Sequence, residues 1–207
     1  MNQISKPVSV KEMTAPIQMA SGRVVDLANL QAADIHWPDL VENLVKIPRF
    51  NGATSHVTYT VAQHCCLMYD RAEDQYKPWA LLRDFHAGFF GEPTWPMLWF
   101  AALKTDCADT FMDAIDEAKG ELTDAIWQAA GLQEGDDDSA ILHRLNYLNL
   151  VDKMLTASER RDLMNGAALD HWPLPTPFPT AVKAWGQDKA REQLELRLKF
   201  IGIRTRG

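Results

Sequence analysis

The chain has 207 residues, of which 46% are apolar and 24% are charged, a composition that supports one folded domain and excludes wholesale disorder. The net charge of −7 argues against a protein held mainly by nucleic-acid phosphates, so we expect no extended nucleic acid as a partner. No apolar run is long enough for a transmembrane helix, the N-terminus lacks a secretory core, and the three cysteines form no disulfide or zinc pattern. We therefore expect a cytoplasmic protein without a membrane partner.

Helical periodicity dominates along the chain, and no segment shows the alternation typical of a strand. Residues 1–20 are predicted to be an N-terminal arm, followed by a helical domain over 21–165. Residues 166–207 are predicted to be a proline-rich connector and a C-terminal helix that packs on the same domain. Helices are expected over residues 38–47, from Thr60 onward, and over 78–90, 96–104, 106–130, 138–164 and 180–200. The pattern predicts an all-α fold built as a single compact bundle.

Three polar residues fall on otherwise apolar helix faces. His64 shares a face with Val61 and Met68, and Asp84 shares one with Leu81 and Gly88. Asp152 continues a stripe formed by Ile141, Leu145, Leu148 and Leu155. A buried carboxylate needs a cation, a hydrogen-bond network or a proton. Each residue alone is explained by ordinary core pairing, whereas three on different helices also fit a site for a hard divalent metal.

Several short runs resemble a known family. They are Arg49-Phe50-Asn51-Gly52, Tyr59-Thr60-Val61-Ala62-Gln63-His64, Leu81-Leu82-Arg83-Asp84 with the Gly91-Glu92-Pro93 that follows, and Asp152 with Thr156-Ala157-Ser158-Glu159 and Asp162-Leu163-Met164 behind it. Over residues 20 to 165 the order and spacing of these runs resemble the HD-domain phosphohydrolases, in particular the bacterial and phage HD-type 5′-deoxynucleotidases. The resemblance implies an HD-like helical bundle in which His64, Asp84 and Asp152 hold a divalent metal.

The sequence departs from the family pattern at two positions. Arg83 stands where the family has the histidine of its His-Asp pair, and Ala87 stands where the deoxynucleotidases have a glutamate. A guanidinium cannot act as a ligand, and at 4 Å it would repel a divalent ion by about 8 kcal/mol at an effective dielectric constant of 20. Either Arg83 points away from the site, or the metal is weak or absent. The loss of an acid-base carboxylate costs about 10²–10⁴-fold in rate.

Arg83 has two interpretations of its own. It could neutralise Asp84 and Asp152 in a structural ion network, or it could hold a phosphate by a bidentate contact. In the second case Arg49, which resembles the family arginine near the phosphate, would converge with Arg83 on the same anion. The sequence favours neither interpretation.

Other residues complete the predicted site. His86, three residues after Arg83, could serve as an acid-base group or as a replacement ligand, and we assign catalytic roles to His86 and Asp84. The resemblance places Phe50 and Trp95 at the substrate, since the family segment that corresponds to Trp95 borders the mouth of the active site.

The expected function is metal-dependent hydrolysis of a phosphoester in a nucleotide or deoxynucleotide. The cofactor would be Mn, Mg or Co, or no metal at all because of Arg83. The alternative is a degenerate HD-fold protein that binds a nucleotide or a protein partner without hydrolysis. Family members are often dimers, so a homodimer is a candidate assembly.

Overall fold

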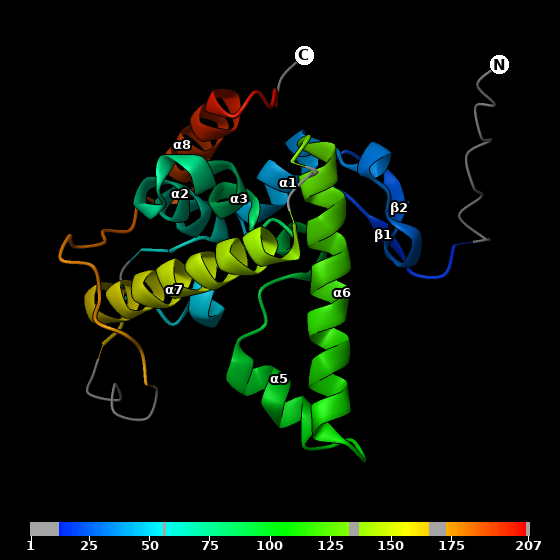
Figure 1. The fold of residues 1–207 in the computed structure, drawn as a ribbon, viewed down its shortest axis with the longest axis horizontal. Coiled ribbons are helices and arrows are strands. Elements are labelled where there is room, and N and C mark those ends of the chain that lie inside the picture. Colours follow the sequence, from blue (N-terminus) through cyan, green and yellow to red (C-terminus); the bar gives the residue numbers. More distant parts are fainter. Residues whose placement is uncertain (1–12, 56, 133–136, 166–172, 206–207) are drawn as a thin grey trace.

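The computed structural model describes residues 13–55, 57–132, 137–165 and 173–205 of the chain (Figure 1). Most of this part is helical. The elements are β1 (Pro16–Gln18), β2 (Val24–Asp26), α1 (Trp37–Leu44), α2 (Val61–Arg71), α3 (Lys77–Leu82), α4 (Ala87–Phe90), α5 (Trp95–Ala102), α6 (Ala108–Ala129), α7 (Asp138–Leu163) and α8 (Gln187–Phe200). The prediction of an all-α fold is confirmed.

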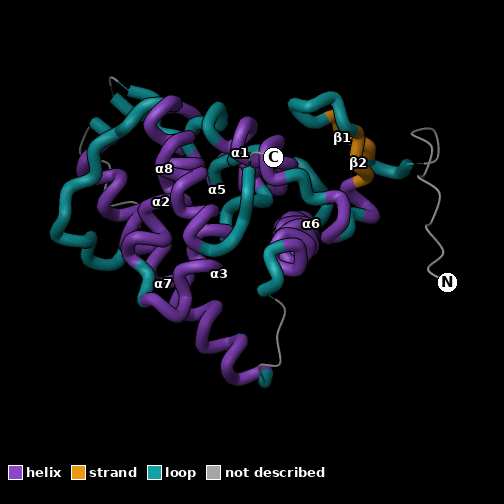
Figure 2. The backbone as a smooth tube through the Cα atoms, turned by 90° about the horizontal axis from the view of Figure 1, so that it is seen from above, coloured by secondary structure: helices purple, strands orange, loops and turns teal. Residues whose placement is uncertain are grey.

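Helix α2 lies at the centre of the packing. It contacts α1, α3, α7 and α8, which surround it in both backbone views (Figures 1 and 2). Cys65 and Cys66 of α2 belong to one buried apolar cluster with residues of α1, α3 and α8, whereas Met68 faces a second cluster with α7. Because α2 is covered on both sides, a polar side chain on it must find its partners inside the protein.

The prediction that Thr60 caps α2 is confirmed. Its Oγ1 accepts a hydrogen bond from the backbone N–H of Gln63 at 3.3 Å, which satisfies one of the donors left open at a helix start. We expect Thr60→Ala to lower the free energy of unfolding by about 1 kcal/mol, the usual cost of a lost N-cap, and Thr60→Ser to lower it less. Urea denaturation measures both variants. Equal losses would mean that the buried methyl group, and not the cap, stabilises the helix.

Residues 16 to 26 form a hairpin, so the expectation of no strand is wrong for this segment. Strands β1 and β2 pair antiparallel, with Ile17 opposite Val25. In the turn, Ser21 donates from both its backbone N and its Oγ to the carboxylate of Asp39 on α1, each at 2.7 Å. Strands of three residues are too short to show alternation. The domain boundary expected after residue 20 falls inside this turn. In the view of Figure 1 the hairpin lies on the other side of α6 from α2.

The helix expected over 78–90 is interrupted. It forms α3 and α4, separated by residues 83–86. Phe85 N donates to Leu82 O and Ala87 N donates to Asp84 O, at 3.2 and 3.1 Å, so the chain tightens into three-residue turns, which often mark a functional position in a helix. Asp84 is therefore presented by the break between two helices.

The C-terminal helix begins at Gln187, seven residues later than the expected start at Thr180. The segment before it is held extended by Gln63 of α2, whose Nε2 donates to Lys183 O and whose Oε1 accepts from Trp185 N, each at 2.8 Å. Helix α8 then packs against α1 and α2, with Leu194 and Leu198 fully buried. The first part of the expected connector, residues 166–172, lies outside the described residues.

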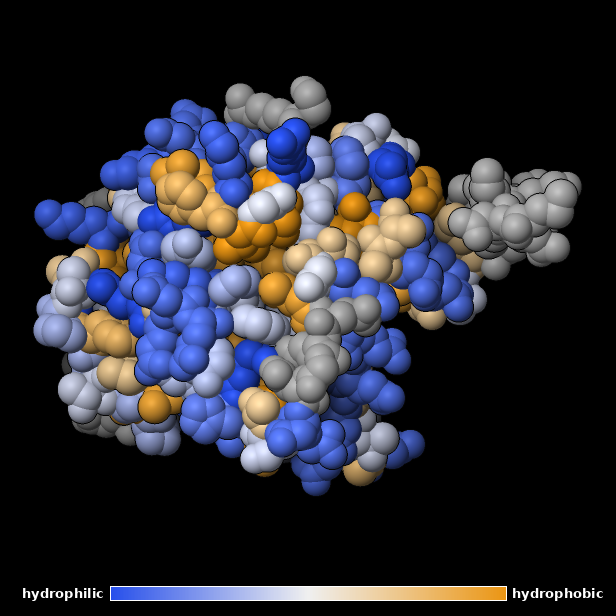
Figure 3. Space-filling view, turned by 45° about the horizontal axis from the view of Figure 1, so that its top comes forward, coloured by the Kyte–Doolittle hydropathy of each residue, from blue (hydrophilic) through white to orange (hydrophobic). Residues whose placement is uncertain are grey.

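Large apolar side chains also lie at the surface, where they interrupt a mostly hydrophilic face (Figure 3). Over all faces of the described part of the chain, the large exposed apolar residues are Val57, Trp95, Met97, Phe100, Leu103, Leu142, Leu145, Leu150, Leu196 and Phe200. The stripe predicted on α7 is therefore buried only from Leu148 onward, because Leu145 is 38% exposed. Among the described helices, none combines the length and the apolarity needed to cross a membrane.

Candidate metal centre

Three side chains from distant parts of the chain meet between α2, the α3–α4 break and α7. His64 comes from α2, Asp84 from the break and Asp152 from the middle of α7. One ligand atom of each lies within 4.8 Å of the other two. The imidazole is fully buried, whereas the Asp84 and Asp152 side chains are 15% and 26% exposed. The structure thus brings together the three residues predicted as metal ligands, in a group that could hold a metal ion.

The two nitrogens of His64 have different surroundings. Nδ1 lies 2.6 Å from Oε1 of Glu159, and since a carboxylate only accepts, Nδ1 carries the hydrogen. Nε2 lies 2.8 Å from Asp84 Oδ2 and 3.4 Å from Asp152 Oδ1, yet it is buried without a partner in hydrogen-bond geometry. A histidine held by a carboxylate through one nitrogen, with the other directed at acidic ligands, is the usual arrangement around a protein-bound metal.

The charges of the group favour a cation at this point. Burial opposes ionisation of Asp84, but His64, Arg83 and Arg49 outweigh it and hold the pKa of Asp84 well below its usual range. The pKa of Asp152 is also lowered, against burial and the repulsion of Asp84, by His64 and Arg83. Both carboxylates are therefore ionised at neutral pH. Burial and Arg49 oppose a charge on His64, but Glu159, Asp152 and Asp84 raise its pKa well above the ordinary value. Without a metal the imidazole is therefore protonated on both nitrogens, and a metal ion would have to displace the proton on Nε2.

Glu159 belongs to the site, although no role was predicted for it from the sequence. It is fully buried on α7, and its Oε1 accepts from Tyr59 Oη at 2.5 Å as well as from His64. Its Oε2 lies 3.3 Å from Nη2 of Arg49, whose other terminal nitrogen, Nη1, donates to Glu92 at 2.8 Å. The available signal was spacing: Glu159 follows Asp152 by seven residues, two helical turns, so both lie on one face of α7.

Arg83 points toward the carboxylates. Its Nε lies 3.7 Å from Asp84 Oδ1, and its Nη2 lies 3.5 Å from Asp152 Oδ2. These are not the oxygens that approach His64, which are Asp84 Oδ2 and Asp152 Oδ1. We call the pair near His64 the inner oxygens and the pair near Arg83 the outer oxygens. These contacts agree with the interpretation of Arg83 as a residue that pairs with both carboxylates, and they show that Arg83 does not turn away from the site.

His86 does not belong to the group of ligand atoms. Its Nδ1 donates to the carbonyl of Arg83 at 3.1 Å and lies 3.3 Å from the hydroxyl of Thr123 on α6. Burial lowers the pKa of the imidazole, so His86 is neutral near pH 7 with a lone pair on Nε2. It can accept a proton there, but the arrangement offers no support for a replacement ligand.

The residues predicted at the substrate differ in their surroundings. Arg49 is buried, and its terminal nitrogens donate to Glu92, Glu159 and Thr156. To contact a phosphate, one of these nitrogens would have to donate to the phosphate in addition to its present acceptor. Phe50 has a left-handed backbone with φ 53°, and the centre of its ring lies 5.3 Å from the Arg49 guanidinium carbon. Trp95 at the start of α5 is 59% exposed and stacks on Trp99.

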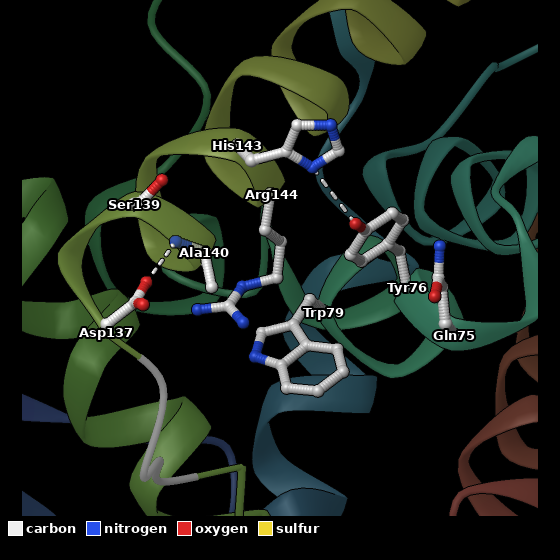
Figure 4. Close-up of a pocket in the computed structure, with 8 residues that line it drawn as sticks. All are labelled: Gln75, Tyr76, Trp79, Asp137, Ser139, Ala140, His143 and Arg144. Carbon is white, nitrogen blue, oxygen red and sulfur yellow. Dashed lines mark hydrogen bonds between the residues drawn. The ribbon is translucent and has the colours of Figure 1, made fainter.

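A separate cavity of about 540 Å³ lies at the N-terminal end of α7 (Figure 4). The Arg144 guanidinium lies 4.7 Å from the centre of the Trp79 ring, and Tyr76 Oη lies 3.1 Å from His143 Nδ1. Arg144 precedes Asp152 by eight residues, roughly 12 Å along the helix axis. None of the three candidate ligands lines this cavity, so it is not part of the metal centre.

The donor set decides which metals fit. One imidazole nitrogen and two carboxylate oxygens suit Mg²⁺, Mn²⁺ and other first-row divalent ions, whose remaining positions are filled by water or substrate. Glu159 fixes the orientation of His64, and the partial exposure of both aspartates leaves a side open to small molecules. His64, Asp84 and Asp152 therefore fit the metal that the sequence analysis predicts.

Comparison of the sequence with protein-family models found no match, and comparison with curated proteins found none either. The fold and the site thus define a helical protein with a His-Asp-Asp group that could hold a metal ion.

Proposed function

We propose that this protein is an HD-type, metal-dependent phosphohydrolase that acts on nucleotides. The observation that carries the proposal is the meeting of His64, Asp84 and Asp152, with Nε2 of His64 directed at the carboxylates and Nδ1 held by Glu159. A metal bound there would polarise a phosphoryl oxygen and lower the pKa of the attacking water. The nucleotide as substrate, preferably a deoxynucleotide, rests on the resemblance to the HD-type deoxynucleotidases.

The residues around the ligands have distinct tasks in this proposal. Glu159 keeps the His64 ring in one orientation and one tautomer, so the ligand loses little entropy on binding. His86, whose pKa burial lowers, would accept or return a proton through Nε2. Phe50 and Trp95 would contact the sugar and base, and Arg49 would border the phosphate through the side that faces Glu92.

The competing proposal is a degenerate member that binds a nucleotide or a protein partner without hydrolysis. Two observations favour it: Arg83 replaces the family histidine, and Ala87, which replaces the family glutamate, is fully buried and offers no acid-base group. We further propose a cytoplasmic location, which the three free cysteines support, and a homodimer, for which the exposed apolar side chains of α5 offer a surface.

The experiment that separates the two proposals has two parts. Metal content is measured on the purified protein with and without added Mn²⁺ or Co²⁺, and phosphate release is screened across deoxynucleoside mono- and triphosphates. We expect stoichiometric metal and release from at least one class of substrate. Failure of every metal and substrate, together with saturable thermal stabilisation by a nucleotide, would favour the degenerate protein. Activity gained only in Arg83→His would show that the arginine disabled the site.

A further inference from the structure

Asp84 and Asp152 use their two oxygens for different neighbours. The inner oxygens lie 2.8 and 3.4 Å from Nε2 of His64. The outer oxygens lie 3.7 and 3.5 Å from the guanidinium of Arg83. A cation bound between His64 and the inner oxygens would therefore leave the outer oxygens to Arg83. The arginine and a metal can occupy opposite sides of the same pair of carboxylates.

The contacts of Arg83 are weak for a guanidinium. Charge-assisted hydrogen bonds usually measure about 2.7–2.9 Å, whereas those of Arg83 are 3.5 Å or longer. Its side chain is 23% exposed. Arg49, the other cation close to the group, is buried and held by Glu92 at 2.8 Å. Of these two guanidinium groups, Arg83 is the one free to turn toward an incoming anion.

A divalent ion changes the balance of charge around Arg83. The two carboxylates carry one negative charge each, so a divalent cation on the inner oxygens neutralises the pair. The charge of Arg83 then has no counterion among the groups that it contacts, and it is repelled by the metal. A phosphate dianion that contacts both the metal and the guanidinium removes this imbalance. The same reasoning implies that, without phosphate, Arg83 weakens metal binding.

We propose that Arg83 is a phosphate-binding residue that couples the binding of a phosphate group to the binding of the metal in this site. The inference rests on the proposed function, because it requires the metal at His64, Asp84 and Asp152. It goes further in assigning a positive role to the residue that breaks the family pattern. Metal and phosphate each raise the affinity of the protein for the other, and by linkage the factor is the same in both directions.

The test is a pair of binding titrations on the full-length protein. The dissociation constant of Mn²⁺ is measured with and without saturating inorganic phosphate, in the wild type and in Arg83→Gln. In the wild type we expect phosphate to tighten Mn²⁺ binding by about tenfold or more, within the usual range of such couplings. In Arg83→Gln we expect tighter Mn²⁺ binding without phosphate, and a coupling about tenfold smaller.

Two further variants serve as controls. Arg23→Gln removes the same charge from an exposed position in the turn of the hairpin and should leave both constants unchanged. Arg83→Lys keeps the charge but not the planar pair of donors, so it should keep Mn²⁺ binding weak while losing most of the phosphate contact. A circular dichroism spectrum and a melting temperature establish that each variant is folded.

The titrations distinguish failure of the inference about Arg83 from failure of the proposed phosphohydrolase function. A coupling that is equal in the wild type and in Arg83→Gln would overturn the inference while leaving a metal-dependent phosphohydrolase intact. Binding of Mn²⁺ by Arg83→Gln alone would also overturn it, because the arginine would then exclude the metal. Intact coupling without hydrolysis of any nucleotide would support the inference and contradict the activity. Absence of Mn²⁺ binding from every variant would contradict both.

Discussion

Replacement of Asp152 by asparagine is expected to remove metal binding and, with it, hydrolysis. The side chain keeps its shape but loses the charge that attracts the cation, and the amide has only one oxygen left for both Arg83 and the metal. Loss of a residue that merely supports a ligand costs about 10–100-fold in metal affinity, so loss of the ligand itself should exceed about 100-fold. Isothermal titration calorimetry with Mn²⁺ measures the change in affinity.

The same variant should lose a little stability when no metal is added. The folded protein lowers the pKa of Asp152 through His64 and Arg83, although burial and Asp84 oppose this. The charged carboxylate therefore stabilises the fold at neutral pH, and since the site is partly exposed its loss should cost about 1 kcal/mol or less. What should disappear is the stabilisation that Mn²⁺ confers on the folded wild type. Asp138→Asn is the matched control, since it makes the same change at an exposed position on the same helix. Unaltered Mn²⁺ affinity in Asp152→Asn would contradict the assignment of this residue as a ligand.

Replacement of Glu159 by glutamine is expected to reduce both stability and metal affinity. The carboxylate is fully buried and accepts from Tyr59 and His64 while it neutralises Arg49. Removing one partner of a buried ion pair costs about 3–5 kcal/mol in the free energy of unfolding. The amide also allows His64 to turn or to change tautomer, so Mn²⁺ affinity should fall by about 10–100-fold. Urea denaturation and Mn²⁺ titration measure the two effects independently.

Glu92→Gln is the control for this result. Glu92 binds the same guanidinium as Glu159, but its side chain is 22% exposed and, in the part of the chain that the structure describes, it forms no hydrogen bond or ion pair with His64. It should therefore lose less stability, about 1 kcal/mol or less for a partly exposed pair, and bind Mn²⁺ as the wild type does. If Glu159→Gln lost only stability, Glu159 would be a structural partner of Arg49 and would not position the metal ligand.

Much of the centre could be predicted because its ligands interrupt regular patterns. Asp152 replaces an apolar residue on a long amphipathic helix, and His64 does so on the helix that Thr60 caps. Helical periodicity depends only on the spacing of residues along the chain, so it can be recognised from the sequence alone. The same spacing could have pointed to Glu159, because an acidic residue two turns after Asp152 shares its face and is costly to bury alone.

The remaining features depend on contacts between distant residues. The hydrogen bond from His64 to Glu159 joins positions 95 residues apart, and that from Arg49 to Glu159 joins positions 110 apart. The break between α3 and α4 directs Asp84 toward His64. Its residues, 83–86, include no proline or glycine from which a break could be predicted. Packing against α2 and α7 determines both the hydrogen bonds of Glu159 and the position of this break.

The sequence by itself determined an all-α fold, the cap of α2 and the identity of three acidic or imidazole side chains directed into the core. Only the tertiary structure decided which oxygen of each carboxylate faces His64 and which faces Arg83. The reason is physical: helix periodicity sets the face of a residue, whereas the rotation of a carboxylate depends on the charges that other helices place around it.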